Sequence, residues 1–298
     1  MSGGAFAAER PPGEPRRVAY LYLLPALAVF ALFVLAPLVH AAWLSLFHWD
    51  GVTVGTWAGA DNYRSVLSDS GLRSAFLHSL VLLAFYALLP VLIGLALAAA
   101  MSRTRVRGLA YFRTVLFLPQ VVALVVVAVM WRMIYAPDGG LINNVLGWLG
   151  LGQPDWLGSF SLALPSVGLI GTWVMYGLAM VLFVAGVQKI PQSLYDAARV
   201  DGAGPLHEFF AVTVPGLRNE IAVALTLTTI AALRNFDLIY MTTRGGPGDA
   251  TSVPAFQVYQ RAFHGGDVGS AAAIGVCLAA IIFVLAFAIN RFAEAGAR

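Results

Sequence analysis

Long apolar stretches alternate with short polar segments along the whole chain. A helix needs roughly 20 apolar residues to span the hydrocarbon core of a bilayer. Six stretches of about that length stand out: Ala19–Phe47, Phe76–Met101, Thr114–Trp131, Leu164–Gln188, Ile221–Met241 and Ser270–Asn290. Only the fifth contains charged residues. The pattern predicts an all-α integral membrane protein with six transmembrane helices.

The composition supports the same class of protein. Hydrophobic residues make up 59% of the 298 residues and charged residues only 11%, whereas a soluble domain carries about 25% charged residues. Most of the surface must therefore face lipid. The first stretch is too long for a signal-peptide core and no small-residue cleavage pattern follows it, so we expect a retained helix. Cys277 is the only cysteine, which excludes an intramolecular disulfide.

Basic residues favour one set of loops. Twelve of the 18 lie in the N-terminal tail, around the loops that follow the second and fourth stretches, and at the C-terminus, against five in the other loops. Because Lys and Arg accumulate in short cytoplasmic loops, we expect both termini in the cytoplasm. Basic residues divided in this way do not form the single basic face of a nucleic-acid-binding protein.

The stretches and loops divide the chain into four parts. Residues 1–18 are rich in Gly, Pro and charge, and we expect a disordered cytoplasmic tail there. Residues 19–73 hold the first transmembrane helix and its outer loop, and residues 74–292 hold helices two to six. Residues 293–298 form a second short tail.

A polar segment over residues 191–217 interrupts the apolar pattern on the expected cytoplasmic side. Ser193 followed by Asp196 resembles a capping box, which predicts a helix from Leu194 to about Val200. Gly202 and Gly204 suit the turn that would follow, because glycine tolerates backbone angles that other residues resist.

A second helix is expected after this turn, because Pro205 suits a first helical turn and Pro215 would end the run. One apolar face of this helix is predicted to hold Leu206, Phe209, Phe210 and Thr213. The pair of helices could lie on lipid headgroups or insert into a groove on a cytoplasmic partner. The pattern alone leaves both possibilities open.

The same segment resembles the EAA loop of ABC importer permeases, whose pattern is E-A-A, three residues, Gly, nine residues and then I-x-L-P. This chain has Asp196-Ala197-Ala198, then Gly202, then Val212-Thr213-Val214-Pro215 at the same spacing. Asp stands in place of Glu, and Val in place of both Ile and Leu. The resemblance implies that residues 191–217 dock into a cleft of a separate ATPase subunit. The residues it assigns to coupling are Asp196, Ala197, Ala198, Gly202, Leu206, Phe209, Phe210 and Pro215.

ATP hydrolysis is expected on that separate subunit. A phosphate-binding P-loop requires G-x-x-x-x-G-K-[ST], and Ile190 follows Lys189, the only lysine of the chain. We therefore expect no enzyme activity and no cofactor in this chain, with ATP and Mg²⁺ bound by the partner ATPase.

Three further pieces resemble one branch of these permeases, the carbohydrate importers of the maltose and glycerol-phosphate type. They are "FRTVLFLPQVV" at 112–122, "GTWVMYGLAMVLFVAGVQKIPQSLYDAARVDGAG" at 171–204 and "NFDLIYMTTRGGPGDAT" at 235–251. The resemblance covers essentially residues 19–292 and implies a type-1 ABC importer permease fold with a core over residues 74–292. It implies alternating access for a sugar or oligosaccharide.

Charged residues inside the fifth stretch indicate a substrate path. Arg234 and Asp237 are one helical turn apart within this apolar stretch. Charges inside the membrane usually face a bundle interior or a water-filled path. They could instead form an intrahelical ion pair, with Arg234 extended toward the outer interface. If they line the path, Asn235 and Asp237 would offer hydrogen bonds to hydroxyl groups. Trp173 and Tyr176 could stack on a sugar ring, although packing is the commoner role.

Two outer loops carry further candidate residues. Gly245-Gly246-Pro247 suits a tight turn, and its resemblance to the family loop implies contact with an extracytoplasmic binding protein. The loop over residues 136–160 predicts a short helix with Leu141, Val145 and Trp148 on one face. Such a helix could cap the path, or Trp148 and Trp156 could anchor the loop at the membrane surface.

The expected protein is one half of a transport pathway in the inner membrane of a bacterium or archaeon. The family implies three kinds of partner: two copies of a cytoplasmic ATP-binding subunit, a second and different permease, and an extracytoplasmic sugar-binding protein with or without a lipid anchor. A permease for glycerol phosphate, an amino acid or a peptide remains an alternative, as does a membrane scaffold. A metal-dependent membrane enzyme is not favoured, because His207-Glu208 lacks the second histidine of a zinc-protease helix.

Overall fold

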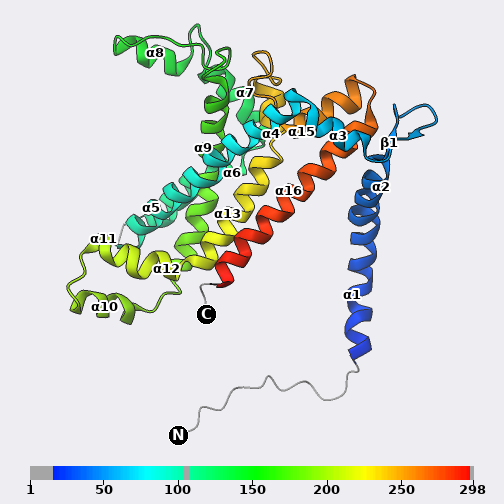
Figure 1. Cartoon of the computed structure of the whole chain (residues 1–298). Coiled ribbons are helices and arrows are strands. Elements are labelled where there is room, and N and C mark those ends of the chain that lie inside the picture. Colours follow the sequence, from blue (N-terminus) through cyan, green and yellow to red (C-terminus); the bar gives the residue numbers. More distant parts are fainter. Residues whose placement is uncertain (1–15, 104–107, 296–298) are drawn as a thin grey trace.

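The computed structural model describes residues 16–103 and 108–295, which form a bundle of long helices with shorter helices at both ends (Figure 1). The helices are α1 Arg16–Phe30, α2 Ala36–Leu44, α3 Asp61–Ser68, α4 Ser70–Leu83, α5 Leu89–Arg103, α6 Leu109–Val121, α7 Leu124–Ile134, α8 Leu141–Trp148, α9 Ala163–Val187, α10 Gln192–Val200, α11 Pro205–Glu208, α12 Val214–Gly216, α13 Arg218–Leu233, α14 Asp237–Thr242, α15 Pro254–Tyr259 and α16 Val268–Ala295. π-Helical turns continue four of them: Ala31–Leu35, Ala84–Leu88, Phe209–Thr213 and Gln260–His264. Strands β1 Phe47–His48 and β2 Thr56–Trp57 pair antiparallel.

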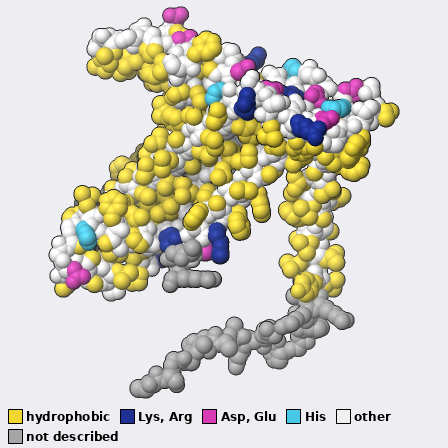
Figure 2. Space-filling view, viewed as in Figure 1, with side chains coloured by type: hydrophobic (Ala, Val, Ile, Leu, Met, Phe, Trp, Pro, Cys, Tyr) yellow, Lys and Arg dark blue, Asp and Glu magenta, His cyan; other side chains and the backbone are white. Residues whose placement is uncertain are grey.

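The helical architecture agrees with a protein that crosses a membrane several times. Four helices of the described residues are long and apolar enough to span a bilayer, and six spans result if each of two bent pairs counts as one. Apolar side chains cover the length of the bundle, and charged side chains gather toward its two ends (Figure 2). This distribution is the one that a lipid environment favours, because charges are costly in hydrocarbon.

The sequence predicts one helix over the third apolar stretch, but the structure contains two helices there. α6 ends at Val121 and α7 begins at Leu124, and the two axes differ by 96°. Val122 and Ala123 have extended ψ angles of 134° and 132°, which interrupts the helical hydrogen bonds. The two halves then pack on different neighbours, α6 on α9 and α7 on α14.

The fifth apolar stretch is also broken. α13 ends at Leu233 and α14 begins at Asp237, so residues 234–236 lie outside both helices. The prediction of one continuous helix over Ile221–Met241 is therefore wrong. At 1.5 Å per residue the 16 residues of α13 extend about 24 Å, less than the roughly 30 Å of a hydrocarbon core.

α9 is the central helix, and small residues let its neighbours approach closely. A Cβ atom on Gly171 would lie 2.0 Å from Cε2 of Tyr86, and one on Gly177 would lie 2.6 Å from the carbonyl oxygen of Leu116. Glycine is therefore required where the π-helical turn Ala84–Leu88 and α6 cross α9. The buried side chains around α9 form two clusters. One, called the outer cluster below, lies toward the end of the bundle that holds α7, and the other lies toward the end that holds α10 and α11, called the docking end.

The first helix stands apart from this bundle (Figure 1). α1, the following π-helical turn and α2 form one rod, and within Tyr20–Leu44 the most apolar window has no buried residue. The rod begins at Arg16, three residues before the predicted start, while residues 1–15, 104–107 and 296–298 lie outside the described residues. The predicted division at residue 73 stays a prediction, and α4 runs across it.

Candidate functional site

Residues 191–217, called the docking element below, form two helical segments side by side at one end of the bundle (Figure 1). α10 begins at Gln192, directly after Pro191, and no side chain caps it. The expected cap by Ser193 is therefore wrong, because the helix starts before this residue. Oδ1 of Asp196 instead accepts a hydrogen bond from Nε2 of Gln192 at 3.3 Å.

The turn between the two helical segments depends on one glycine. α10 ends at Val200, and Gly202 adopts a φ of +79°, a backbone conformation that is costly for other residues. The N–H of Gly202 donates to the carbonyl of Arg199 at 3.0 Å, and the N–H of Ala203 to the carbonyl of Ala198 at 2.9 Å. This pair of bonds defines a Schellman motif, so Gly202 and Ala198 shape the turn through their backbones.

Arg199 links the two halves of the docking element. Its Nε donates to Oε1 of Glu208 at 2.9 Å, and its Nη1 donates to Oδ1 of Asp196 at 3.3 Å. The Glu208 side chain is 10% exposed, whereas the Asp196 side chain is 61% exposed. Solvent and salt therefore screen the Arg199–Glu208 pair less than the Arg199–Asp196 pair. Asp196 therefore keeps most of its surface available, beside the exposed Ala197.

The apolar face of the second segment is divided between the interior and the surface. Phe209 packs on the buried cluster at the docking end, and Thr213 is buried with its hydroxyl 3.1 Å from that of Tyr195. Leu206 and Phe210 are 75% and 66% exposed. The prediction that these four residues share one face is therefore only partly correct: two hold the segment to the bundle, and two project outward.

A bend joins the docking element to the bundle. The break expected at Pro215, before the fifth span, is present: the helix ends at Gly216, one residue later, and the chain then turns by 71° into α13. Leu217, at the bend, is fully buried. Nζ of Lys189 lies 3.0 Å from Oε1 of Glu220 and ties the end of α9 to the start of α13. The docking element is therefore attached to both helices that flank it.

The break at residues 234–236 places polar groups at the far end of α13. Arg234 and Asp237 are exposed, and within the described residues no ion pair joins them, so the alternative of an intrahelical pair is wrong. Asn235 lies between them and is only 6% exposed. The break thus turns two charges outward and one amide inward.

Two buried polar side chains meet at this break. The Tyr86 side chain lies beside Asn235 and interacts with its amide. The Asn235 Nδ2 and the Tyr86 hydroxyl make no further hydrogen bond within the described residues, and the buried Trp131 Nε1 and Gln120 Oε1 make none there. Buried polar groups are almost always paired, so these atoms offer donors and acceptors to a polar solute.

The aromatic candidates on α9 have different surroundings. Trp173 is half-buried, and its ring meets that of Trp131 nearly at right angles with centroids 5.7 Å apart. Trp173 also packs against the outer buried cluster. Tyr176, one turn further along α9, is half-buried as well. The contacts of Trp173 fit the packing role, while stacking on a sugar stays a prediction for both.

The glycine turn after α14 is folded inward. Gly245 is buried, has a φ of +85°, and a Cβ atom there would lie 2.7 Å from Cε1 of Phe256. The hydroxyl of Thr251 donates to the carbonyl of Gly246 at 2.8 Å. Pro247 is half-buried and follows a cis peptide bond. Contact of these three residues with a binding protein stays a prediction.

The helix predicted in the second outer loop is present as α8. Trp148 is 86% exposed and fits a membrane anchor. Trp156 does not fit one, because its Nε1 donates to Oδ1 of Asn143 at 2.8 Å and its ring packs on Tyr135 with centroids 5.6 Å apart. Trp156 therefore joins the loop to α7.

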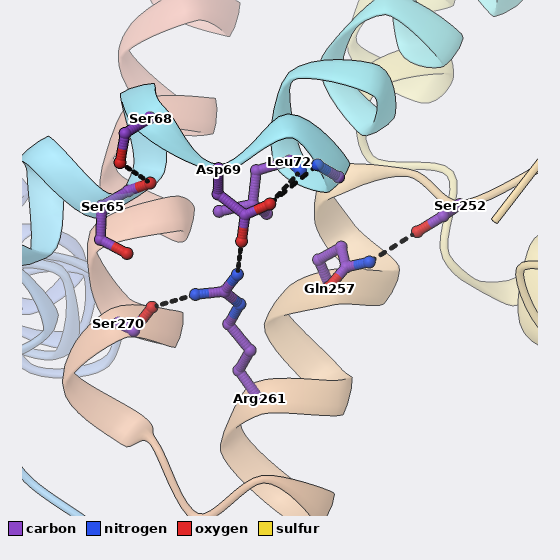
Figure 3. Close-up of polar contacts among 9 residues, drawn as sticks. Ser65, Ser68, Asp69, Leu72, Ser252, Gln257, Arg261 and Ser270 are labelled. Carbon is purple, nitrogen blue, oxygen red and sulfur yellow. Dashed lines mark hydrogen bonds and ion pairs between the residues drawn. The ribbon is translucent and has the colours of Figure 1, made fainter.

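Asp69 joins three elements (Figure 3). It lies between α3 and α4, at the end of the bundle opposite the docking element (Figure 1). Its Oδ1 accepts from the N–H groups of Gly71 at 2.8 Å and Leu72 at 3.2 Å, which caps α4. Its Oδ2 accepts from Nη2 of Arg261 at 2.5 Å, and Nη1 of Arg261 donates to the Ser270 hydroxyl at 2.7 Å. Burial acts to raise the pKa of Asp69, but these donors outweigh it and lower the pKa.

Comparison with known proteins decides the family. Residues 90–297 match the family described as "Binding-protein-dependent transport system inner membrane component". The chain belongs to this family. The predictions of a multi-pass inner-membrane protein, and of an importer permease rather than an enzyme, are confirmed.

Relatives and a solved structure place this permease more closely. The diacetylchitobiose uptake system permease protein NgcF of Streptomyces coelicolor is 33% identical, over 91% of this chain and 81% of that protein. The trehalose/maltose transport system permease protein MalF of Thermococcus litoralis is 34% identical, over 92% of each chain. The crystal structure of a bacterial ABC transporter that imports alginate has the same fold, with a TM-score of 0.79 at 23% identity, over 93% of this chain and 95% of that chain.

Sequence reasoning missed two ion-pair clusters of the permease. Asp69 directly precedes an apolar helix, and this N-cap position is itself a sequence signal. Its partner Arg261 lies 192 positions away and has no such signal. The pairing of Arg199 with Glu208 spans a turn whose geometry depends on Gly202, so spacing alone could not predict it.

Proposed function

We propose that this permease imports a sugar or oligosaccharide. The observation that carries the proposal is the similarity along nearly the whole chain to NgcF and MalF, whose names state the uptake of diacetylchitobiose and of trehalose or maltose. The buried polar groups of Asn235 and Tyr86 at the break support it, because a solute rich in hydroxyl groups can donate to them and accept from them.

The proposed complex contains four further subunits. Two copies of a cytoplasmic ATP-binding subunit hold ATP and Mg²⁺, a second and different permease completes the path, and an extracytoplasmic binding protein delivers the sugar. This chain binds no cofactor. The exposed α1–α2 rod supports the presence of lipid and a partner permease around it, since the described chain contacts the rod mainly at the α2 end, through α16, and leaves its most apolar window without a buried residue.

The docking element is proposed to receive the motion of the ATPase. Leu206 and Phe210 project outward as an apolar knob, and such side chains bind partners by entering a groove. Arg199 and Gly202 hold the two segments in one geometry behind this knob. Closure of the ATPase dimer on ATP would therefore move the docking element as a unit.

α13 is proposed to carry this motion to the substrate path. One end of α13 follows the bend at Leu217, and the other end is the break that contains Asn235. Because a helix of 16 residues moves as a rod of about 24 Å, displacement at the docking end reaches residues 234–237. Alternating access then opens the path to the cytoplasm or to the outside in turn.

Purification of the complex tests this proposal. The chain is isolated from gently solubilised membranes, and its partners are identified by mass spectrometry. In a Cys277→Ser background, Ala197→Cys is expected to cross-link to an ATPase subunit. Val54→Cys, 93% exposed in the outer hairpin, is the matched control and should not cross-link.

Uptake measurements in membrane vesicles then identify the solute. The binding protein recovered with the complex is loaded with trehalose, maltose, diacetylchitobiose, sn-glycerol 3-phosphate or an amino acid. ATP-dependent uptake of a sugar supports the proposal. Uptake of only a non-sugar solute would overturn the sugar assignment, and recovery of the chain without any ATPase would overturn the importer assignment.

A further inference from the structure

A cavity of about 380 Å³ lies where α7 and α14 end, opposite the docking element. Its lining consists of Arg132, Tyr240, Met241, Thr242, Thr243 and Arg244. The cavity thus contains two guanidinium groups, a phenol and two hydroxyl side chains, and its lining contains no carboxylate. This composition is complementary to an anion.

The backbone of one of the two arginines, Arg244, is strained. Arg244 has a φ of +51°, the only positive φ among the described residues other than glycine. Its N–H donates to the carbonyl of Ile239 at 2.8 Å, so it occupies the position after a helix end where glycine is usual. A side chain in this conformation costs free energy, and residues kept in such conformations cluster at functional sites.

The turn behind Arg244 is rigid. The hydroxyls of Thr243 and Thr251 lie 2.7 Å apart, and Thr251 also donates to the carbonyl of Gly246. Gly245 packs against Phe256. Arg244 is therefore attached to a hydrogen-bonded turn. Its backbone loses less conformational freedom on binding than that of a residue in a loose loop.

Neither arginine of the cavity is neutralised within the described residues. Within those residues neither guanidinium makes a hydrogen bond or an ion pair, and both arginines are exposed. Arg261, on the same end of the bundle, is in contrast held by Asp69 and Ser270. The last turn of a helix favours a positive charge, which accounts for Arg132 on α7 but not for the strained Arg244.

We propose that Arg132 and Arg244 form an oxyanion-binding pocket that receives an acidic side chain of the extracytoplasmic binding protein. This inference rests on the proposed function and names the chemistry of that contact. Gly245 is buried and Gly246 and Pro247 are half-buried, whereas Arg244, directly before them, is exposed. Arginine pairs with carboxylates through two parallel hydrogen bonds, and exposed charges of this kind govern association rate and salt dependence.

The test measures stimulation of ATP hydrolysis in nanodiscs by the binding protein that co-purifies with the complex. The double variant Arg132→Gln, Arg244→Gln is expected to raise the half-saturating concentration of binding protein about tenfold and to flatten its salt dependence. Arg244→Lys should restore part of the affinity. Arg73→Gln, an exposed arginine outside the cavity, is the matched control and should leave both quantities unchanged.

Arg244→Gly separates binding from folding. Glycine relieves the positive φ, so this variant should melt no lower than the wild type, yet it should still raise the half-saturating concentration. If this variant and the double variant keep wild-type concentration and salt dependence, the inference is wrong.

Two further outcomes would point to an anionic solute as the ligand or to failure of the proposed function. If the double variant loses uptake of sn-glycerol 3-phosphate while the binding protein stimulates it normally, the pocket serves an anionic solute and our inference is overturned. If no binding protein stimulates even the wild-type complex, the proposed function fails and this inference fails with it. The wild-type measurement therefore distinguishes the two failures.

Discussion

Removal of the Phe210 ring should weaken binding of the ATPase without unfolding the permease. Phe210 is 66% exposed on the docking element. A phenylalanine side chain that becomes fully covered buries about 200 Å², so about 130 Å² is available for a partner. At about 25 cal/mol per Å² this area corresponds to about 3 kcal/mol. Alanine keeps part of it, which leaves an expected loss of about 2 kcal/mol, or about 30-fold in Kd.

Binding of the purified ATPase to immobilised permease in nanodiscs measures this loss. The permease carries Phe210→Ala, and the matched control is Phe263→Ala, which is 77% exposed in the π-helical turn Gln260–His264. This turn follows α15, at the end of the bundle opposite the docking element (Figure 1). The control should bind the ATPase like the wild type. Thermal unfolding should change little for both variants, because substitutions at exposed positions usually alter stability by less than about 0.5 kcal/mol.

Two results would refute the reasoning. An unchanged Kd for Phe210→Ala would mean that this ring is not covered by the ATPase, and the knob would then face lipid headgroups instead. A weakened Kd accompanied by a large fall in melting temperature would mean that Phe210 supports the fold, contrary to its exposure.

Two further predictions concern the fold itself. Gly171→Ala places a Cβ within 2.0 Å of the Tyr86 ring and should destabilise the protein by about 1–3 kcal/mol, whereas Gly275→Ala, with open space around it, should not; melting temperatures of the purified variants check both. The lowered pKa of Asp69 contributes stability above the unfolded pKa of about 3.9, and this stability is lost as the pH falls through the lower folded pKa. The melting temperature of the wild type should therefore fall more steeply below pH 4 than that of Asp69→Asn, which lacks the ion pair with Arg261; an equal pH dependence would contradict this account.

Hydropathy could predict which parts of the chain cross the membrane but not where the helices break. The apolar windows exist because lipid surrounds them, and a bend does not change hydropathy. Residues 122–123 and 234–236 interrupt two windows, although neither site contains glycine or proline. Packing of each half on a different neighbour selects these breaks, and such contacts between distant segments have no local sequence signal.

The docking element shows the same limit on a smaller scale. Spacing predicted its two segments and its glycine turn, because Gly202 supplies a local backbone requirement. Spacing placed Leu206, Phe209 and Phe210 together, but the π-helical turn Phe209–Thr213 and the bundle divide them between surface and interior. Burial depends on what lies opposite a helix, which periodicity does not specify.

The isolated position of the first helix means that the chain consists of two units stabilised for different reasons. No buried cluster of the described residues draws on a residue before Tyr63. Packing of α2 on α16 and the hydroxyl contact between Ser45 and Tyr63 at 2.6 Å attach only one end of the rod. The rest of the rod therefore depends on the lipid and the partner permease proposed around it, whereas the later helices hold one another. A harsh detergent should therefore displace the rod from the bundle well before it unfolds the later helices. A purified complex can then contain the full-length chain and still have lost the native position of its first helix.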